Sequence, residues 1–194
     1  ILGGESTEPE TPPGTPDEPE TPAGVTELKN GDQVVIFAPS HNKALSSKPA
    51  SSGSYYQMGV DVTVADGAVT GYESTEIWTV VVNSDGTYSF EQGGKKLGMQ
   101  NDFSSMSMGS VNDKWNIIAL EGTLYNIKNV VRGNFIEWYE SKNNWSTYGA
   151  SDAATNKLFQ LSFYVVGKGI LGGESTEPET PPVTPDEPET PAGV

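Results

Sequence analysis

The sequence predicts an all-β domain that lies between two extended, proline-rich segments. In the middle of the chain, short apolar runs rich in Val, Ile, Tyr, Phe and Trp alternate with turn-forming residues at intervals of about 8–12 positions. No stretch of this region has the apolar spacing of an amphipathic helix. The two ends of the chain, in contrast, consist mainly of Glu, Thr, Pro and Gly and contain no aromatic or basic residue.

The end segments, 1–25 and 170–194, are copies of one sequence that differ only at Gly14 and Val183. Such a composition buries too little apolar surface to offset the entropy of ordering, and its proline density and charge favour an extended backbone. We therefore interpret both segments as linkers and residues 26–169 as the domain. The repetition predicts a tandem array of linkers and domains, in which each module has further copies of itself as neighbours.

The charge of the chain is concentrated in these copies, which hold 12 of its 26 acidic residues and account for most of the net charge of −15. The domain is nearly balanced and has no polybasic face, so a nucleic-acid partner is not expected. No apolar run is long enough to cross a bilayer, so membrane insertion is not expected either.

Eight segments of the domain have strand character because β-branched and aromatic residues alternate or cluster in them. Asp85-Gly86 joins the third and fourth segments, and Glu121-Gly122 joins the fifth and sixth, as hairpin turns in which glycine supplies a positive φ. The predicted strands, in chain order, are residues 33–38, 61–64, 77–82, 87–91, 115–120, 124–128, 135–139 and 159–166.

A weaker internal repeat groups these strands into three similar units. Three openings match, EIWTVVV from Glu76, DKWNIIAL from Asp113 and KLFQLSF from Lys157. The first two lead into the hairpins YSFEQGGKKLGM and YNIKNVVRGNFIEW, and the third counterpart, VVIFAPSHNKAL, lies at the start of the domain. The C-terminal strand thus completes the unit that begins at the N-terminus. The pattern predicts a β-trefoil-like closed barrel of three pseudo-repeats, and closure removes strand edges that would otherwise template aggregation.

The blocks GDQVVIFAPSHNKALSS, IWTVVVNSDGTYSFEQGGKKLGM, GNFIEWYESKNNWSTY and LFQLSFYVV give this domain a family resemblance. Together they resemble a trefoil-like accessory module of large secreted and surface-attached proteins of Gram-positive anaerobes, often found beside nucleases, nucleotidases or esterases. The resemblance implies an extracellular, non-catalytic module. The strict Gln-x-Trp of ricin-type trefoils is replaced by Trp78-Thr79-Val80, Trp115-Asn116-Ile117 and Phe159-Gln160-Leu161, which argues against a ricin-type galactose site.

One stretch, WYESKNNWSTYG from Trp138, has the composition of a carbohydrate site. Aromatic rings stack on sugar faces, and amides bond sugar hydroxyls. The alternative is that strand alternation buries Trp138 and Trp145 in the barrel or its cap. Tyr55-Tyr56 and FSSMSMG from Phe103 are interpreted as strand residues, although both could form an exposed contact surface. The candidate ligand-binding residues are Trp138, Tyr139, Asn143, Asn144, Trp145 and Tyr148.

The linkers contain one feature that a pure spacer does not need, an Ile-Leu pair followed by two glycines. The pair occurs as Ile1-Leu2 and again as Ile170-Leu171. Branched apolar side chains can fill a groove while glycines let the backbone approach closely. We therefore predict that these four residues dock on a trefoil surface and connect neighbouring repeats in a regular fibre.

No catalytic, metal or cofactor site is predicted. Cys is absent, and the single histidine, His41, falls in a turn opposite Gly93-Gly94 and Gly133-Asn134 of the other units. Glu137 and Glu140, three apart on a strand, point to opposite faces. Asn83-Ser84-Asp85-Gly86 resembles the start of a calcium loop but lacks the remaining ligands.

Two functions fit these observations. The first is a non-catalytic structural or adhesive module of an extracellular tandem-repeat surface or filament protein. The alternative is a carbohydrate-binding module whose weak single sites act together by repetition on cell-wall or host glycans.

Overall fold

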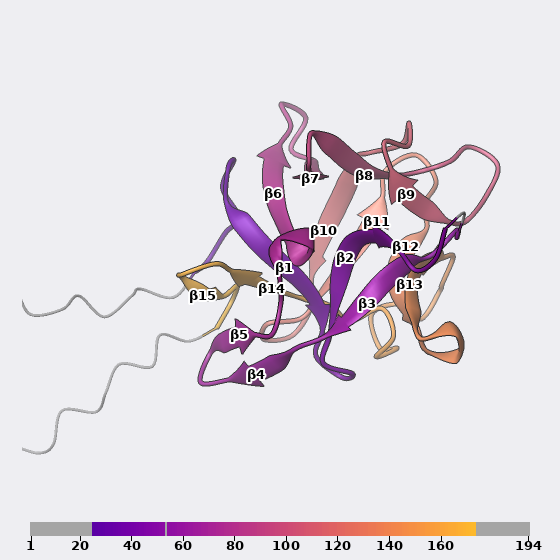
Figure 1. The fold of residues 1–194 in the computed structure, drawn as a ribbon. Coiled ribbons are helices and arrows are strands. Elements are labelled where there is room, and N and C mark those ends of the chain that lie inside the picture. The colour runs from indigo at the N-terminus through magenta and orange to yellow at the C-terminus, as the bar shows by residue number, and fades with distance from the viewer. Residues whose placement is uncertain (1–24, 53, 174–194) are drawn as a thin grey trace, which may run out of the picture. The chain divides into compact units, whose positions relative to one another are not determined.

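The computed structural model describes residues 25–52 and 54–173, which form a β-sheet protein (Figure 1). Two short 3₁₀-helices, η1 (Ser74–Glu76) and η2 (Glu140–Lys142), interrupt the strands. The strands are β1 (Gln33–Ala38), β2 (Lys43–Pro49), β3 (Gln57–Asp61), β4 (Thr63–Ala65), β5 (Ala68–Thr70), β6 (Ile77–Val82), β7 (Tyr88–Gln92), β8 (Lys95–Met99), β9 (Met106–Met108), β10 (Trp115–Ala119), β11 (Tyr125–Asn129), β12 (Phe135–Tyr139), β13 (Asn144–Tyr148), β14 (Ser162–Val165) and β15 (Gly169–Ile170).

Strand pairing divides the domain into three equivalent units of four strands. The units are β6 to β9, β10 to β13, and β14 followed by β1, β2 and β3. Within each unit the first strand pairs antiparallel with the second, the second with the third, and the third with the fourth. This arrangement is a β-trefoil, and it confirms that the C-terminal strand supplies the first strand of the N-terminal unit.

The first two strands of each unit form a six-stranded barrel that closes on itself. Strand β1 connects two units because it pairs with β14 on one side, where Val34 faces Val165, and with β6 on the other. Strand β7 pairs with β10 in the same way. The ring closes between Tyr125 and Leu161, whose backbone N–H groups donate to each other's carbonyls at 2.8 and 2.9 Å. The predicted contact between the two ends of the domain is therefore confirmed.

Two buried tryptophans on barrel strands form hydrogen bonds to the hairpin strands β2 and β8. Trp78 donates its indole N–H to the carbonyl of Leu45 at 2.9 Å, and Trp115 donates to the carbonyl of Leu97 at 3.0 Å. Both rings are fully buried, so these bonds satisfy polar atoms that burial would otherwise penalise. The third unit has Phe159 at the matching position, where no ring N–H needs a partner.

The predicted turns form as expected. Gly86 and Gly122 have φ values of 79° and 62° in the hairpins that join β6 to β7 and β10 to β11. The Asp85 carboxylate accepts bonds from Thr87 within its hairpin and from Lys114, which directly precedes β10. His41 lies in the turn between β1 and β2, but the positive φ of that turn, 51°, belongs to Asn42.

Predicted strand boundaries are correct for β1, β6 and β12, agree to within one residue for β7, β10 and β11, and are wrong for the other two predicted strands. The predicted strand 61–64 is two strands, because the chain turns at Val62, whose N–H donates to the Asn42 carbonyl. The strand expected from Phe159 begins at Ser162, since Phe159 itself closes a turn with Asn156. The short strands β5, β13 and β15 were not predicted, whereas β9 lies within the stretch FSSMSMG, which was interpreted as strand.

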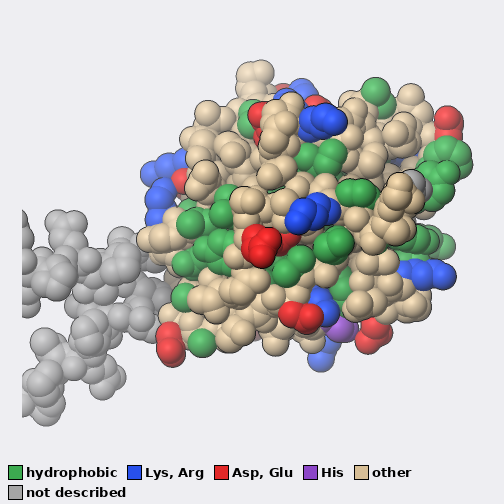
Figure 2. All heavy atoms as spheres, viewed as in Figure 1, with side chains coloured by type: hydrophobic (Ala, Val, Ile, Leu, Met, Phe, Trp, Pro, Cys, Tyr) green, Lys and Arg blue, Asp and Glu red, His purple; other side chains and the backbone are tan. Residues whose placement is uncertain are grey.

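Charged side chains are dispersed over the surface of the domain. Acidic and basic groups are interspersed on the face that Figure 2 shows. Several form ion pairs, among them Lys43 with Asp61 at 2.7 Å and Lys168 with Asp32 at 2.8 Å. In the part of the chain that the structure describes, no helix has the length and apolar character needed to span a membrane.

The trefoil continues past the predicted boundary at residue 169. Strand β15 pairs with β14, and the Leu171 N–H donates to the Phe163 carbonyl at 2.9 Å. The Leu171 side chain is 3% exposed and belongs to the main core, whereas Ile170 packs against a smaller cluster around Val35 and Phe37. Gly172 follows with a φ of 75°, and a Cβ there would lie 2.8 Å from the Tyr125 hydroxyl.

Leu171 thus completes the core of its own domain and is not free to dock on a neighbouring repeat. The physical reason is that β15 folds back on β14 directly after the turn at Gly167 and Lys168. Ile1 and Leu2, the other two predicted docking residues, lie outside the described residues.

We predict that Leu171→Ala lowers the free energy of unfolding by about 2–4 kcal/mol, because it leaves a cavity in the core. Ile118→Ala is the matched control: Ile118 is 41% exposed on β10, and its loss should cost less than about 1 kcal/mol. Chemical denaturation measures both. Equal small effects would show that residues 170–173 are not part of the folded unit.

Candidate carbohydrate site

Strand alternation in the β12–β13 hairpin separates the predicted site into two faces. Trp138 and Trp145 face each other across the hairpin, with ring centroids 5.6 Å apart at 72°. They are 2% and 0% exposed, and the Trp145 indole N–H donates to the Ala44 carbonyl at 3.0 Å. Their rings belong to the core and offer no face to a ligand, so their prediction as ligand-binding residues is wrong.

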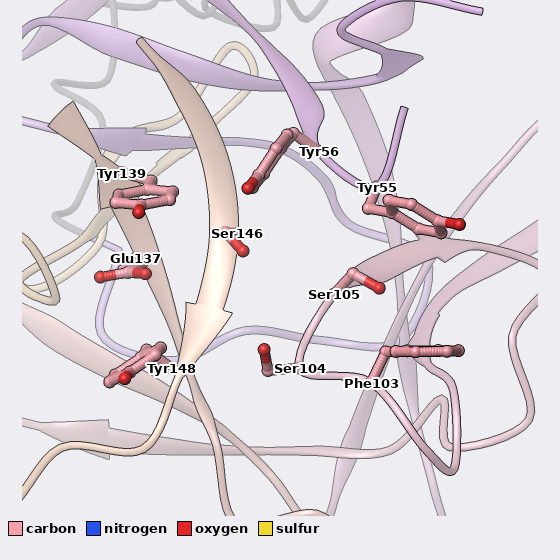
Figure 3. A pocket seen from close by; sticks show the side chains of 9 residues that line it. All are labelled: Tyr55, Tyr56, Phe103, Ser104, Ser105, Glu137, Tyr139, Ser146 and Tyr148. Carbon is pink, nitrogen blue, oxygen red and sulfur yellow. The ribbon is translucent and has the colours of Figure 1, made fainter. Parts of the chain in front are cut away.

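The opposite face of the hairpin borders a cavity of about 540 Å³. Glu137 and Tyr139 reach it from β12, and Ser146 and Tyr148 reach it from β13 (Figure 3). Two of the predicted residues, Tyr139 and Tyr148, are therefore at the cavity. The other two are not among its lining residues: Asn143 has a left-handed backbone after η2, and Asn144 begins β13.

Two loops from the other units complete the cavity. Tyr55 and Tyr56 precede β3, and Phe103 lies between β8 and β9, followed by Ser104 and Ser105. The cavity therefore collects one segment from each unit of the trefoil. Tyr56 packs on Tyr139 with ring centroids 5.8 Å apart, and Tyr55 packs on Phe103 at 6.1 Å.

Three of these rings are largely open to solvent. Tyr55, Phe103 and Tyr148 are 66%, 60% and 61% exposed. The interpretation of Tyr55 and Phe103 as strand residues is wrong, since both lie in loops. The sequence signal that marks them is an aromatic residue within a serine-rich loop, where it has no alternating apolar neighbours to pack with.

Glu137 is the charged group of this cavity. Its side chain lies between Tyr139 and Tyr148 in Figure 3, and the residue is 7% exposed. Burial raises the pKa of the Glu137 carboxyl, since desolvation disfavours the ionised form. Glu140 lies apart from it on η2, where its Oε1 is 3.3 Å from His41 Nε2. The two carboxylates do not share a site.

The cavity can hold a polar ligand with flat apolar faces. Five aromatic rings offer stacking surfaces, while three serine hydroxyls and one carboxylate offer hydrogen bonds. Within residues 25–52 and 54–173, no cluster of three or more His, Asp or Glu side chains is placed to hold a metal ion.

Comparison with known proteins places the chain by its fold. No protein-family model and no curated protein sequence matches it. Among solved structures it is similar to ThreeFoil, a designed three-fold symmetric protein, with 18% identity and a TM-score of 0.51 over 68% of this chain and 96% of that one.

Two natural proteins show the same similarity. The ricin B-like lectin of Macrolepiota procera, solved with lactose, has 9% identity and a TM-score of 0.56 over 71% of this chain and 98% of the lectin. An endo-β-galactosidase of Clostridium perfringens that releases GlcNAcα1-4Gal has 14% identity and a TM-score of 0.54 over 68% of this chain. The match spans 32% of that enzyme. At these identities the similarity establishes the β-trefoil fold.

We predict that Glu137→Gln raises the free energy of unfolding at pH 7. The folded-state pKa is raised, so the ionised carboxyl destabilises the fold above that pKa, and the amide removes this cost. Near pH 3, where both folded and unfolded states are protonated, the two proteins should be equally stable. Thermal unfolding of both proteins between pH 3 and pH 7 tests this prediction, with Glu121→Gln at an exposed position as the control. A difference in stability between the two proteins that does not change with pH would contradict it.

Proposed function

We propose that this chain is a non-catalytic carbohydrate-binding module whose site is the aromatic cavity beside the β12–β13 hairpin. The observation that carries the proposal is the lining itself, in which five aromatic rings surround one carboxylate and three hydroxyls. Sugar rings present flat C–H faces to aromatic side chains and hydroxyls to polar ones, so they match both parts of the lining.

Position in the fold supports the same function. The cavity lies where the β12–β13 hairpin meets loops of the other two units, and such loops vary without disturbing the barrel that holds them. A lectin solved with lactose has the same fold, which makes glycan binding compatible with this architecture. The residues that we assign to binding are Tyr55, Tyr56, Phe103, Glu137, Tyr139 and Tyr148.

The separation of the acidic groups supports a non-catalytic role. Hydrolysis of a glycosidic bond needs two carboxyl groups that flank the bond. The cavity contains one, Glu137, while Glu140 contacts His41 on a different surface. We assign the site to binding alone.

The setting that we propose is extracellular, on a cell surface or in a secreted protein. It rests on the resemblance to accessory modules of Gram-positive anaerobes and on the repeated acidic linkers. Several modules in one chain would bind a polymeric cell-wall or host glycan together, so a weak single site would give a strong overall attachment.

A structural or adhesive role in a tandem-repeat filament is the second candidate. Leu171 favours it, because the first residues of the second linker copy are held in the core of the domain before them. Each linker would then start from a fixed point. Residues 174–193 would separate neighbouring domains by up to roughly 60 Å in an extended conformation.

We predict that a glycan array detects binding by the intact chain and that Tyr148→Ala lowers the affinity at least about tenfold, because a stacking face is lost. Val131→Ala is the control, since Val131 is 70% exposed and does not line the cavity. Unchanged binding in Tyr148→Ala and in a Tyr139→Ala variant that stays folded would place the glycan site elsewhere.

For the filament role we predict that two modules joined by residues 174–193 move closer together as salt is raised, because acidic groups along the linker repel each other less. Small-angle scattering at about 0.02 and 0.5 M salt measures the separation. A linker with its acidic residues changed to Gln and Asn should lose the salt response. One sharp, salt-independent separation would instead indicate a regular fibre.

A further inference from the structure

Glu137 is a charged residue at a position where the other two units of the trefoil have small uncharged residues. Leu45, Leu97 and Ile136 are fully buried residues at corresponding places on β2, β8 and β12. They are followed by Ser46, Gly98 and Glu137, so one unit alone carries a carboxylate there. At Gly98 even a Cβ would lie 2.7 Å from the Ser110 carbonyl oxygen, so that unit has no room for a side chain.

This carboxylate has no ion-pair partner among the described residues. Among the ion pairs of the described residues, which Lys43, Lys96, Lys114, Lys168 and His41 form, none includes Glu137. Desolvation is the one cause of its raised pKa, with no hydrogen bond or nearby cation to offset it. The nine lining residues include no Lys or Arg. An unpaired buried carboxylate is costly, and a cation that enters the cavity would remove the cost.

The surrounding rings favour the same kind of ligand. Tyr139 and Tyr148 lie on either side of Glu137 (Figure 3), and Tyr56 packs on Tyr139. The faces of aromatic rings are electron-rich and attract ammonium groups, most strongly where water is excluded. A carboxylate between tyrosine rings therefore provides both charge and shape complementarity for a small cation.

We propose that the cavity binds a ligand through a compact cationic group, a primary amine or a quaternary ammonium, held between the Glu137 carboxylate and the adjacent tyrosine rings. When the amine belongs to an amino sugar, this inference rests on the proposed function. The ligand class of the carbohydrate-binding site is then a glycan with unacetylated amino groups. A choline-type headgroup presents the same chemistry from a different source.

Calorimetric titration of the intact chain separates these sources. The probes are a β1-4 oligomer of glucosamine at about pH 6.5, the matched N-acetylated oligomer, and choline chloride, whose charge does not depend on pH. We expect the glucosamine oligomer to bind at least ten times more tightly than its N-acetylated form. Binding of choline without the glucosamine oligomer would identify the headgroup source and still support a cation site.

Glu137→Gln keeps the size of the side chain and removes its charge, so the cationic probe should bind at least tenfold more weakly. Glu140→Gln changes the net charge equally, outside the cavity, and should bind as the unaltered chain does. The inference is overturned if neither cationic probe binds, or if the N-acetylated oligomer binds as tightly as the glucosamine oligomer. It is also overturned if Glu137→Gln does not change the affinity for the cationic probe. If the Glu137→Gln variant still binds neutral glycans, and this binding depends on Tyr148, the proposed function holds although the inference about a cationic ligand fails.

Discussion

The pairing of β1 with β14 is the interaction on which the rest of the structure depends. It brings the two ends of the domain together, from Val34 opposite Val165 to Phe37 opposite Ser162. Because β1 also pairs with β6, this one strand joins the unit that β14 opens to the unit that β6 opens and lets the six barrel strands form a ring. A closed ring fixes the distances between the three hairpins, and these distances determine which loops can share a cavity.

Threefold repetition and its local breakdown have different consequences in this molecule. The repeated elements, such as the indole bonds of Trp78 and Trp115, produce the core and tolerate little change. Where repetition fails, Phe159 replaces a tryptophan at the start of the unit of β14, and Glu137 replaces a small residue in the unit of β10 to β13. The barrel remains intact in both places, and the β12–β13 hairpin carries a carboxylate that the other two units lack. Symmetry thus accounts for stability, and its loss in one unit accounts for the candidate site.

The sequence predicts the trefoil because strand period and internal repetition are local signals, visible in EIWTVVV and DKWNIIAL. It predicts the candidate site only in part. The stretch from Trp138 to Tyr148 supplies two lining residues of the cavity, Tyr139 and Tyr148, but its two tryptophans are buried where Trp138 pairs with Trp145 across the hairpin. Tyr55 and Phe103 reach the cavity from other units, and their approach depends on barrel closure. No local sequence pattern predicts that these two loops lie next to the β12–β13 hairpin.

The position of Leu171 in the core has a consequence for synthesis on the ribosome. Strand β14 and Leu171 are the last parts of the domain to emerge, and β1 cannot complete its pairing before β14 is available. The domain can therefore complete its fold only after the first residues of the second acidic segment have left the exit tunnel. Until then β1 presents an unpaired strand edge, which is the kind of edge that makes a partly folded chain prone to aggregation.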